Sequence, residues 1–153
     1  MTGSNAILSI NDSVAYHIHR SARLLRAHLL RRIRELGYEA TPEQWFVLNK
    51  LHQREGRIQS ELSDEIFSDR PNITRILDGM ERHGWITRKS DGRDGRRKQV
   101  FLTRAGRRVA QEIADMARVE RAVIFNGLSD EDMAATRRLL EKLESNLRRV
   151  MEP

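Results

Sequence analysis

The sequence predicts a mainly α-helical fold with a small β-hairpin wing, in which a winged helix-turn-helix is flanked by helices at both ends of the chain. Apolar residues recur at three- and four-residue steps over most of the chain, which is the period of an amphipathic helix. Two β-prone runs, 85–87 and 99–102, are separated by the turn dipeptides Asp91-Gly92 and Asp94-Gly95. A short helix, a turn and a second helix precede these runs, which is the element order of a winged helix-turn-helix.

The first two helices are predicted from apolar periodicity and capping residues. The first covers about residues 12–36 and ends at Gly37, a residue type that suits a helix C-terminus. Its apolar positions are numerous enough that it is expected to bury two sides: Val14, Ile18, Ala22, Leu24, Leu25, Leu29, Leu30, Ile33 and Leu36. The second helix begins at Thr41, which can cap it, with Pro42 in the first turn and Gln44 as the partner in a capping box.

The next two helices form the predicted helix-turn-helix. The first spans about residues 60–66, and the second begins near residue 68 or 69, where Ser or Asp can cap it. Pro71 is tolerated because it lies in the first turn. The inner face of the second helix is apolar: Ile73, Ile76, Leu77 and Met80. Asn72 and Arg75 fall away from that face.

Two further helices follow the hairpin, one capped by Thr103 and one capped by Ser129. Together with the first helix they carry more apolar surface than a winged module of this size needs. We therefore expect residues 1–36 and 104–153 to form a helical dimerisation region. Residues 41–103 are expected to form a winged helix-turn-helix DNA-binding domain.

The composition of the 153 residues excludes several kinds of protein. There is no cysteine, so disulfides, zinc-thiolate sites and thiol redox sensing are excluded. The N-terminus lacks the pattern of a signal peptide, and no apolar run approaches the ~18 residues that cross a bilayer, so a cytoplasmic protein without membrane association is expected. His17 and His19 would lie about 200° apart on a helix, so no metal is predicted. No cofactor is predicted either.

The positive charge is concentrated in one part of the chain. The net charge is +6, and residues 70–108 alone hold 12 Lys and Arg against 4 Asp and Glu. Residues 1–69 are neutral in sum, and residues 109–153 carry a net charge of −2. Localised positive charge of this kind attracts a polyanion.

The second helix of the helix-turn-helix is the first candidate site. Asn72 can bind the edge of an adenine, and Arg70 or Arg75 can bind a guanine or hold a phosphate. The predicted DNA-binding residues of this helix are Arg70, Pro71, Asn72, Thr74 and Arg75. Four residues outside it can hold phosphates, which positions a protein without specifying sequence: Arg57, Gln59, Ser60 and Arg88.

The hairpin tip is the second candidate site. A narrow minor groove attracts inserted arginine, and the tip is rich in cations: Arg93, Arg96, Arg97 and Lys98. Asp94 lies among them and is predicted to have a structural role, because a carboxylate that accepts a hydrogen bond from Arg96 would fix the loop. The alternative is a flexible charged loop with no fixed geometry.

Five motifs occur in order and at matching spacing, and through them the chain resembles the MarR family of bacterial transcriptional regulators from about residue 12 to residue 150. These motifs are Thr41-Pro42-Glu43-Gln44-Trp45, Arg70-Pro71-Asn72-Ile73-Thr74-Arg75, Asp94-Gly95-Arg96, Leu102-Thr103 followed by Gly106, and Gly127-Leu128-Ser129. One departure is Gly95, where the family often has a basic residue. The basic residues here lie on either side, at Arg93 and Arg97.

The resemblance implies a homodimer that binds a pseudo-palindromic operator in double-stranded DNA. It also implies a repressor that a small aromatic or phenolic molecule releases from DNA. The implied effector pocket lies between the dimer helices and the winged domain, and the candidate lining residues are Tyr16, His17, Arg20, Tyr38 and Trp45. For each of these a plainer role stays open: Trp45 as a core residue, for example, or Arg20 as a solvated one.

Two other functions compete with this interpretation. A basic winged-helix module could bind RNA or protein without reading a DNA duplex, although the basic region has no aromatic cluster for stacking on single strands. An enzyme is not predicted, because the chain has no cysteine nucleophile, no phosphate-binding glycine loop and no known catalytic signature.

Overall fold

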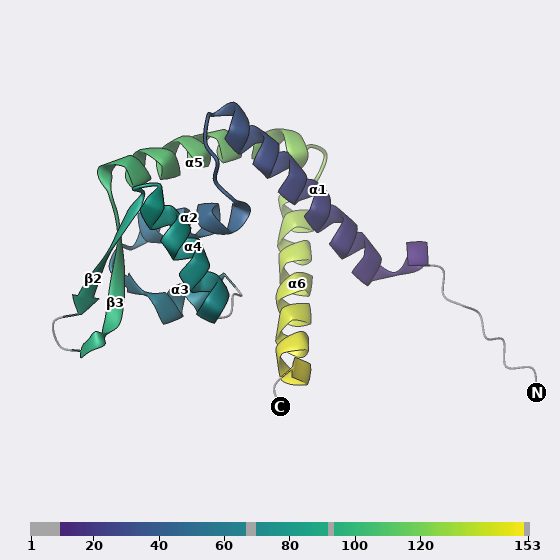
Figure 1. Cartoon of the computed structure of the whole chain (residues 1–153). Helices are drawn as coiled ribbons and strands as arrows, with labels where there is room; N and C mark the ends of the chain where they lie inside the picture. The colour runs from purple at the N-terminus through teal and green to yellow at the C-terminus, as the bar shows by residue number, and fades with distance from the viewer. Residues whose placement is uncertain (1–9, 67–69, 92–93, 152–153) are drawn as a thin grey trace, which may run out of the picture. The chain divides into compact units, whose positions relative to one another are not determined.

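The computed structural model describes residues 10–66, 70–91 and 94–151, and the side chains of residues 70, 91 and 94–97 lie outside that description. The elements, drawn in Figure 1, are η1 (Ile10–Asp12), α1 (Val14–Glu35), α2 (Pro42–Gln53), β1 (Arg57–Ile58), α3 (Gln59–Glu65), α4 (Arg70–Arg82), β2 (Ile86–Asp91), β3 (Asp94–Leu102), α5 (Arg104–Ile124) and α6 (Asp130–Met151). They form two compact units, one ending at Ala117 and one beginning at Arg118, so the boundary falls within α5. The fold is that of a winged helix protein, as the sequence predicted.

The predicted helix starts are confirmed where the structure describes them. Thr41 Oγ1 accepts a hydrogen bond from the Gln44 backbone N–H, and the Gln44 side chain accepts one from the Thr41 N–H, which completes the capping box of α2. Ser129 and Asp132 form the same reciprocal pair at the start of α6. Caps at residues 68 and 69 lie outside the described residues.

A glycine ends α1 as expected. Gly37 has a φ of 85°, a conformation that L side chains rarely adopt, and its N–H donates to the Arg34 carbonyl. The next N–H, that of Tyr38, donates to the Ile33 carbonyl. These bonds satisfy two carbonyls at the helix end. Within one chain, however, α1 buries only Ile33, so the expected burial of two sides is not achieved by the chain alone.

The sheet is larger than the sequence predicted. Its three strands are antiparallel in the order β1-β3-β2, and β1 was not foreseen at all. A strand of two residues is too short to show an alternating pattern. The hairpin strands also extend well beyond the predicted runs, toward Asp91 on one side and Asp94 on the other, and the hairpin lies beside α4 (Figure 1).

The hydrophobic core lies in the unit that ends at Ala117. It joins α2, α3, α4, the sheet and the first half of α5, and its fully buried residues include Leu48, Leu51, Leu62, Leu77, Met80, Val100 and Ile113. This core anchors the inner face of α4, so the opposite face of that helix is held in a fixed direction. None of the described helices combines the length and low charge that crossing a bilayer requires.

Candidate nucleic-acid interface

The outer face of α4 presents the polar residues that the sequence singled out. Ile73 and Leu77 are fully buried, whereas Pro71 and Arg75 are exposed and Asn72 is half-buried. The Arg75 guanidinium donates a hydrogen bond of 2.8 Å to the Asn72 side-chain oxygen. The structure therefore brings an amide and a guanidinium together on the side of α4 that faces away from the core. Both groups can form bidentate contacts with base edges.

Two other predicted contacts meet at the junction of α3 and α4. The Gln59 amide donates a hydrogen bond of 2.7 Å to the Thr74 hydroxyl, and both residues are partly buried. Ser60 is exposed beside Gln59. This bond links the beginning of α3 to α4, so it contributes to the orientation of α4 whatever else the two side chains contact.

Arg57 is held inside the helix-turn-helix. Its side chain is only 12% exposed and forms an ion pair with Glu65, at the end of α3. Lys50 on α2 contacts the same carboxylate at 3.3 Å. Burial pushes the pKa of Glu65 upward, but the hydrogen bonds from Lys50 and Arg57 outweigh it and leave the pKa below its ordinary value. The ionised carboxylate thus ties together α2, β1 and α3.

Arg88, another predicted phosphate contact, is also paired within the chain. Its side chain is 16% exposed, and its guanidinium contacts Asp78 at 2.6 Å and Glu81 at 2.5 Å. The hydrogen bond from Arg88 lowers the pKa of Glu81, in spite of a smaller opposing effect of burial. Neither carboxylate was predicted from the sequence, because Asp78 and Glu81 are ten and seven residues from Arg88 along the chain.

The wing supplies further positive charge. Lys98 is exposed on β3, and the Lys89 ammonium on β2 lies 5.2 Å from the centre of the Phe101 ring. Arg93 lies outside the described residues, as do the side chains of Arg70, Asp94, Arg96 and Arg97. Their predicted roles stay predictions.

The predicted effector residues have four different surroundings. Trp45 is 8% exposed and belongs to the core. Tyr38 donates a hydrogen bond of 2.7 Å to Glu112, and this bond raises the pKa of the phenol. The rings of Tyr16 and His17 meet edge to face at 5.7 Å, and His17 Nε2 lies 2.7 Å from the Asn11 carbonyl oxygen. Arg20 is exposed on α1.

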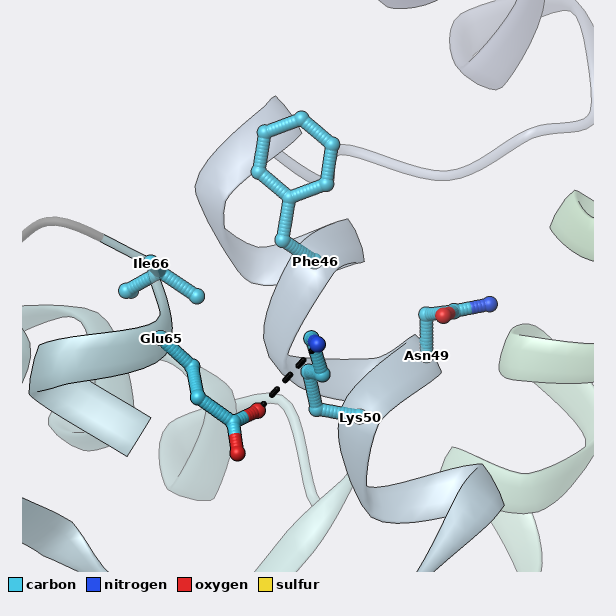
Figure 2. Close-up of a pocket in the computed structure, with 5 residues that line it drawn as sticks. All are labelled: Phe46, Asn49, Lys50, Glu65 and Ile66. Carbon is cyan, nitrogen blue, oxygen red and sulfur yellow. Dashed lines mark ion pairs between the residues drawn. The ribbon is translucent and has the colours of Figure 1, made fainter. Parts of the chain in front are cut away.

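A pocket between α2 and the end of α3 involves none of these residues. Figure 2 shows its lining, which is formed by Phe46, Asn49, Lys50, Glu65 and Ile66. The Lys50–Glu65 ion pair forms one side, and the Phe46 side chain is 48% exposed. The sequence did not predict this pocket, because its lining residues come from α2 and from the end of α3, which only the folded chain brings together.

Among the described residues, no group of three or more His, Asp or Glu side chains is arranged to hold a metal ion. The hydrogen-bond donors of the described site are arginine, lysine and amide side chains. Such groups donate hydrogen bonds to phosphates and base edges.

Known proteins that are similar to this chain are regulators of transcription, which agrees with an interface built for DNA. Residues 40–98, which include α2, α3, α4 and most of the hairpin, match the family model described as MarR family. A probable transcriptional regulator from Pseudomonas aeruginosa is 28% identical, with a TM-score of 0.76 over 88% of this chain and 99% of that one.

Two solved structures in complex with other molecules share the fold. The PcaV transcriptional regulator from Streptomyces coelicolor, solved with its natural ligand, is 22% identical with a TM-score of 0.82 over 92% of this chain and 97% of that one. The transcriptional repressor CouR, bound to a 23-mer DNA duplex, is 22% identical with a TM-score of 0.80 over 88% of this chain and 94% of that one. Residues 40–98 thus carry a MarR family domain, and over most of its length the chain is similar to transcriptional regulators that share its winged helix fold.

Proposed function

We propose that the protein is a dimeric regulator that binds a specific pseudo-palindromic operator and represses transcription from it. The observation that carries this proposal is the outer face of α4, where Asn72 and Arg75 lie together while the opposite face is fixed by the core. A helix held in this way can enter the major groove and present both side chains to base edges.

The charge distribution supports the same function. Phosphate contacts supply most of the affinity of such a protein, and their number sets how strongly binding falls with salt. The net charge of +8 in residues 70–108 spans α4, the hairpin and the start of α5. In the proposed complex, α4 reads the major groove and the cations of the wing contact the adjacent minor groove. The repressor CouR, which has this fold, has been solved on duplex DNA.

Dimerisation would supply the second half-site. Large apolar side chains are exposed along α1, the end of α5 and α6, and within one chain α6 buries no residue at all. We propose that these faces pack against a second copy, with residues 1–36 and 104–153 as the dimerisation region and 41–103 as the DNA-binding domain. Two recognition helices would then lie about 34–36 Å apart, which is one turn of DNA, or a multiple of it.

Release by a small aromatic ligand completes the proposal. Its support is the MarR family match of residues 40–98 and the fold shared with PcaV, which was solved with its natural ligand. Of the candidate lining residues, Tyr16, His17 and Arg20 lie on α1 and have the accessibility that a ligand contact needs. Trp45 would have to act from the core, as the wall behind a ligand. Addition of 4-hydroxybenzoate and related phenolic acids to the protein–DNA complex tests this step.

The experiment that tests DNA recognition compares two duplexes by fluorescence anisotropy over a salt series. One carries the sequence upstream of the protein's own gene, and the other has the same composition in scrambled order. Preference for the first is expected, and Asn72→Ala or Arg75→Ala should reduce that preference by about 1–3 kcal/mol for each base-edge interaction that the substitution removes. Arg137→Ala, on exposed α6, is the matched control and should change little.

A basic module for RNA or protein would give a different result. It would bind both duplexes weakly, equally and with a steep dependence on salt. Equal binding by the wild-type protein would therefore contradict sequence-specific regulation.

A further inference from the structure

Three charged side chains connect the proposed recognition helix to the wing. Arg88 on β2 donates from Nη2 to Asp78 Oδ1 at 2.6 Å and to Glu81 Oε2 at 2.5 Å, and from Nε to the same Glu81 oxygen at 3.1 Å. We call these three residues the Arg88 strut. A guanidinium suits this role because its donors lie in one rigid plane and can serve two carboxylates at once.

The backbone directs the strut toward α4. Side chains on a strand alternate between the two faces, so Arg88 shares a face with the buried Ile86. Lys89 takes the opposite face, where it lies over Phe101. On the helix, Asp78 and Glu81 are three residues apart and therefore lie on one side of α4.

The strut leaves Arg88 little capacity for DNA. Its side chain is 16% exposed, while those of Asp78 and Glu81 are 42% and 41% exposed, so Arg88 is the more covered member of each pair. Its Nε and Nη2 donors are already used by these carboxylates, which leaves only the remaining guanidinium donors for any other partner. Charge-assisted hydrogen bonds of this length are among the stronger ones in proteins.

We propose that Arg88 is a positioning residue that fixes the angle between α4 and the hairpin, so that both can reach DNA at the same time, and that it is not itself a phosphate contact. The proposal rests on the DNA-binding function proposed above. It reverses the role that the sequence assigned to Arg88. It also assigns a function to two of the four acidic residues in the basic region 70–108.

The two roles of Arg88 predict opposite effects for removal of a carboxylate. If Arg88 held a phosphate, Asp78→Ala or Glu81→Ala would release it and remove a negative charge that repels DNA, so affinity would rise. If the strut sets the angle of the wing, the same changes should weaken operator binding by about tenfold. They should weaken binding to scrambled duplex much less, because nonspecific binding does not require helix and wing to fit one site.

The test measures operator and scrambled-duplex affinity over a salt series for Asp78→Ala, Glu81→Ala, Arg88→Met, Arg88→Lys and the double variant Glu81→Ala/Arg88→Met. Asp64→Ala is the control for loss of charge, because this carboxylate lies exposed on α3 and is not a member of the Arg88 strut. Circular dichroism and thermal melting identify the variants that keep the fold. The operator-to-scrambled ratio is the readout, since a loss of stability alone would lower the active fraction equally for both duplexes.

Support would be a lower ratio for each single variant, with the double variant no worse than Arg88→Met alone. Arg88→Lys should resemble Arg88→Met, since one ammonium cannot replace the two-sided contact. The proposal is overturned if the carboxylate variants bind more tightly, or if Arg88→Met weakens both duplexes equally and reduces the salt slope by about one, as removal of a phosphate-binding cation does. A wild-type protein with no operator preference would contradict the proposed function, and the strut's role with it.

Discussion

Individual arginines in this chain differ in what their surroundings allow them to do. Arg75 is exposed beside Asn72, whereas Arg57 and Arg88 are mostly covered and paired with carboxylates. The sequence predicted DNA contacts for all three, because each occupies a plausible place in a basic motif. The carboxylates that pair with Arg57 and Arg88, such as Glu65, are brought close by tertiary structure. Their positions along the sequence do not indicate these pairs.

The carboxylates in these pairs predict acid sensitivity of the fold. The hydrogen bond from Arg88 lowers the pKa of Glu81 below its ordinary 4.5, and Glu65 also has a lowered pKa once the bonds from Lys50 and Arg57 have outweighed burial. A carboxyl whose pKa is lower in the folded chain stabilises the fold above its unfolded pKa, and this stabilisation is lost as the pH falls through the folded pKa.

The free energy of unfolding in urea should therefore change little from these groups above about pH 5 and fall progressively below it. Glu65→Gln and Glu81→Gln should each make that fall shallower. Glu144→Gln, on an exposed face of α6, provides the comparison. An identical fall in all four proteins would show that these pairs do not set the acid sensitivity.

The elements themselves were predicted where capping chemistry is local, and were missed where pairing is distant. The Thr41–Gln44 capping box and the Ser129 cap follow from residues within four positions of one another, and both are present. β1 forms only because it meets β3, as Arg57 pairs with Val100 across more than forty residues. The extra length of the hairpin likewise comes from strand pairing, and not from the β propensity of Arg, Lys and Asp.

The start of α5 is fixed to the base of the wing by a close contact that only glycine allows. The Thr103 N–H donates to the Trp85 carbonyl at 2.9 Å, and Thr103 Oγ1 accepts from the Gly106 N–H at 3.0 Å. A Cβ on Gly106 would lie 1.9 Å from the Trp85 carbonyl oxygen, which is backbone and cannot rotate away.

Gly106→Ala should therefore destabilise the protein by about 1–3 kcal/mol, as overpacking in a close-packed region does. The sign of this change in the free energy of unfolding shows whether the close contact matters. Without the contact, alanine would usually stabilise a helical position relative to glycine by about 0.5–1 kcal/mol. Urea unfolding of the variant and the wild type at neutral pH measures the difference. A more stable variant would mean that α5 can move away from Trp85 without penalty.

At the scale of the whole molecule, many of the large apolar side chains that are exposed in the described part of the chain lie on the terminal helices. On α6 the exposed apolar residues recur at helical spacing: Leu139, Leu140, Leu143, Leu147 and Val150. A contiguous exposed stripe of this kind marks an interaction site in a soluble protein. The sequence was sufficient to predict this stripe, because helical periodicity is local. It does not contain the geometry with which a second copy would cover it.

The proposed dimer makes a prediction that joins this surface to function. Glutamate at Leu143 and Leu147 would place two charges in the middle of an apolar contact, where an unpaired charge is costly. The double variant Leu143→Glu/Leu147→Glu should elute as a monomer in size-exclusion chromatography with light scattering at micromolar concentration, while the wild type elutes as a dimer.

The double variant should also lose most of its operator affinity, because a monomer has only one recognition helix and one wing to bind a single half-site. Ser145→Glu adds one such charge about 200° from Leu143 around α6, given 3.6 residues per turn, and should leave both properties unchanged. A double variant that stays dimeric would show that α6 is not the contact, and a monomeric wild type would refute the dimer itself.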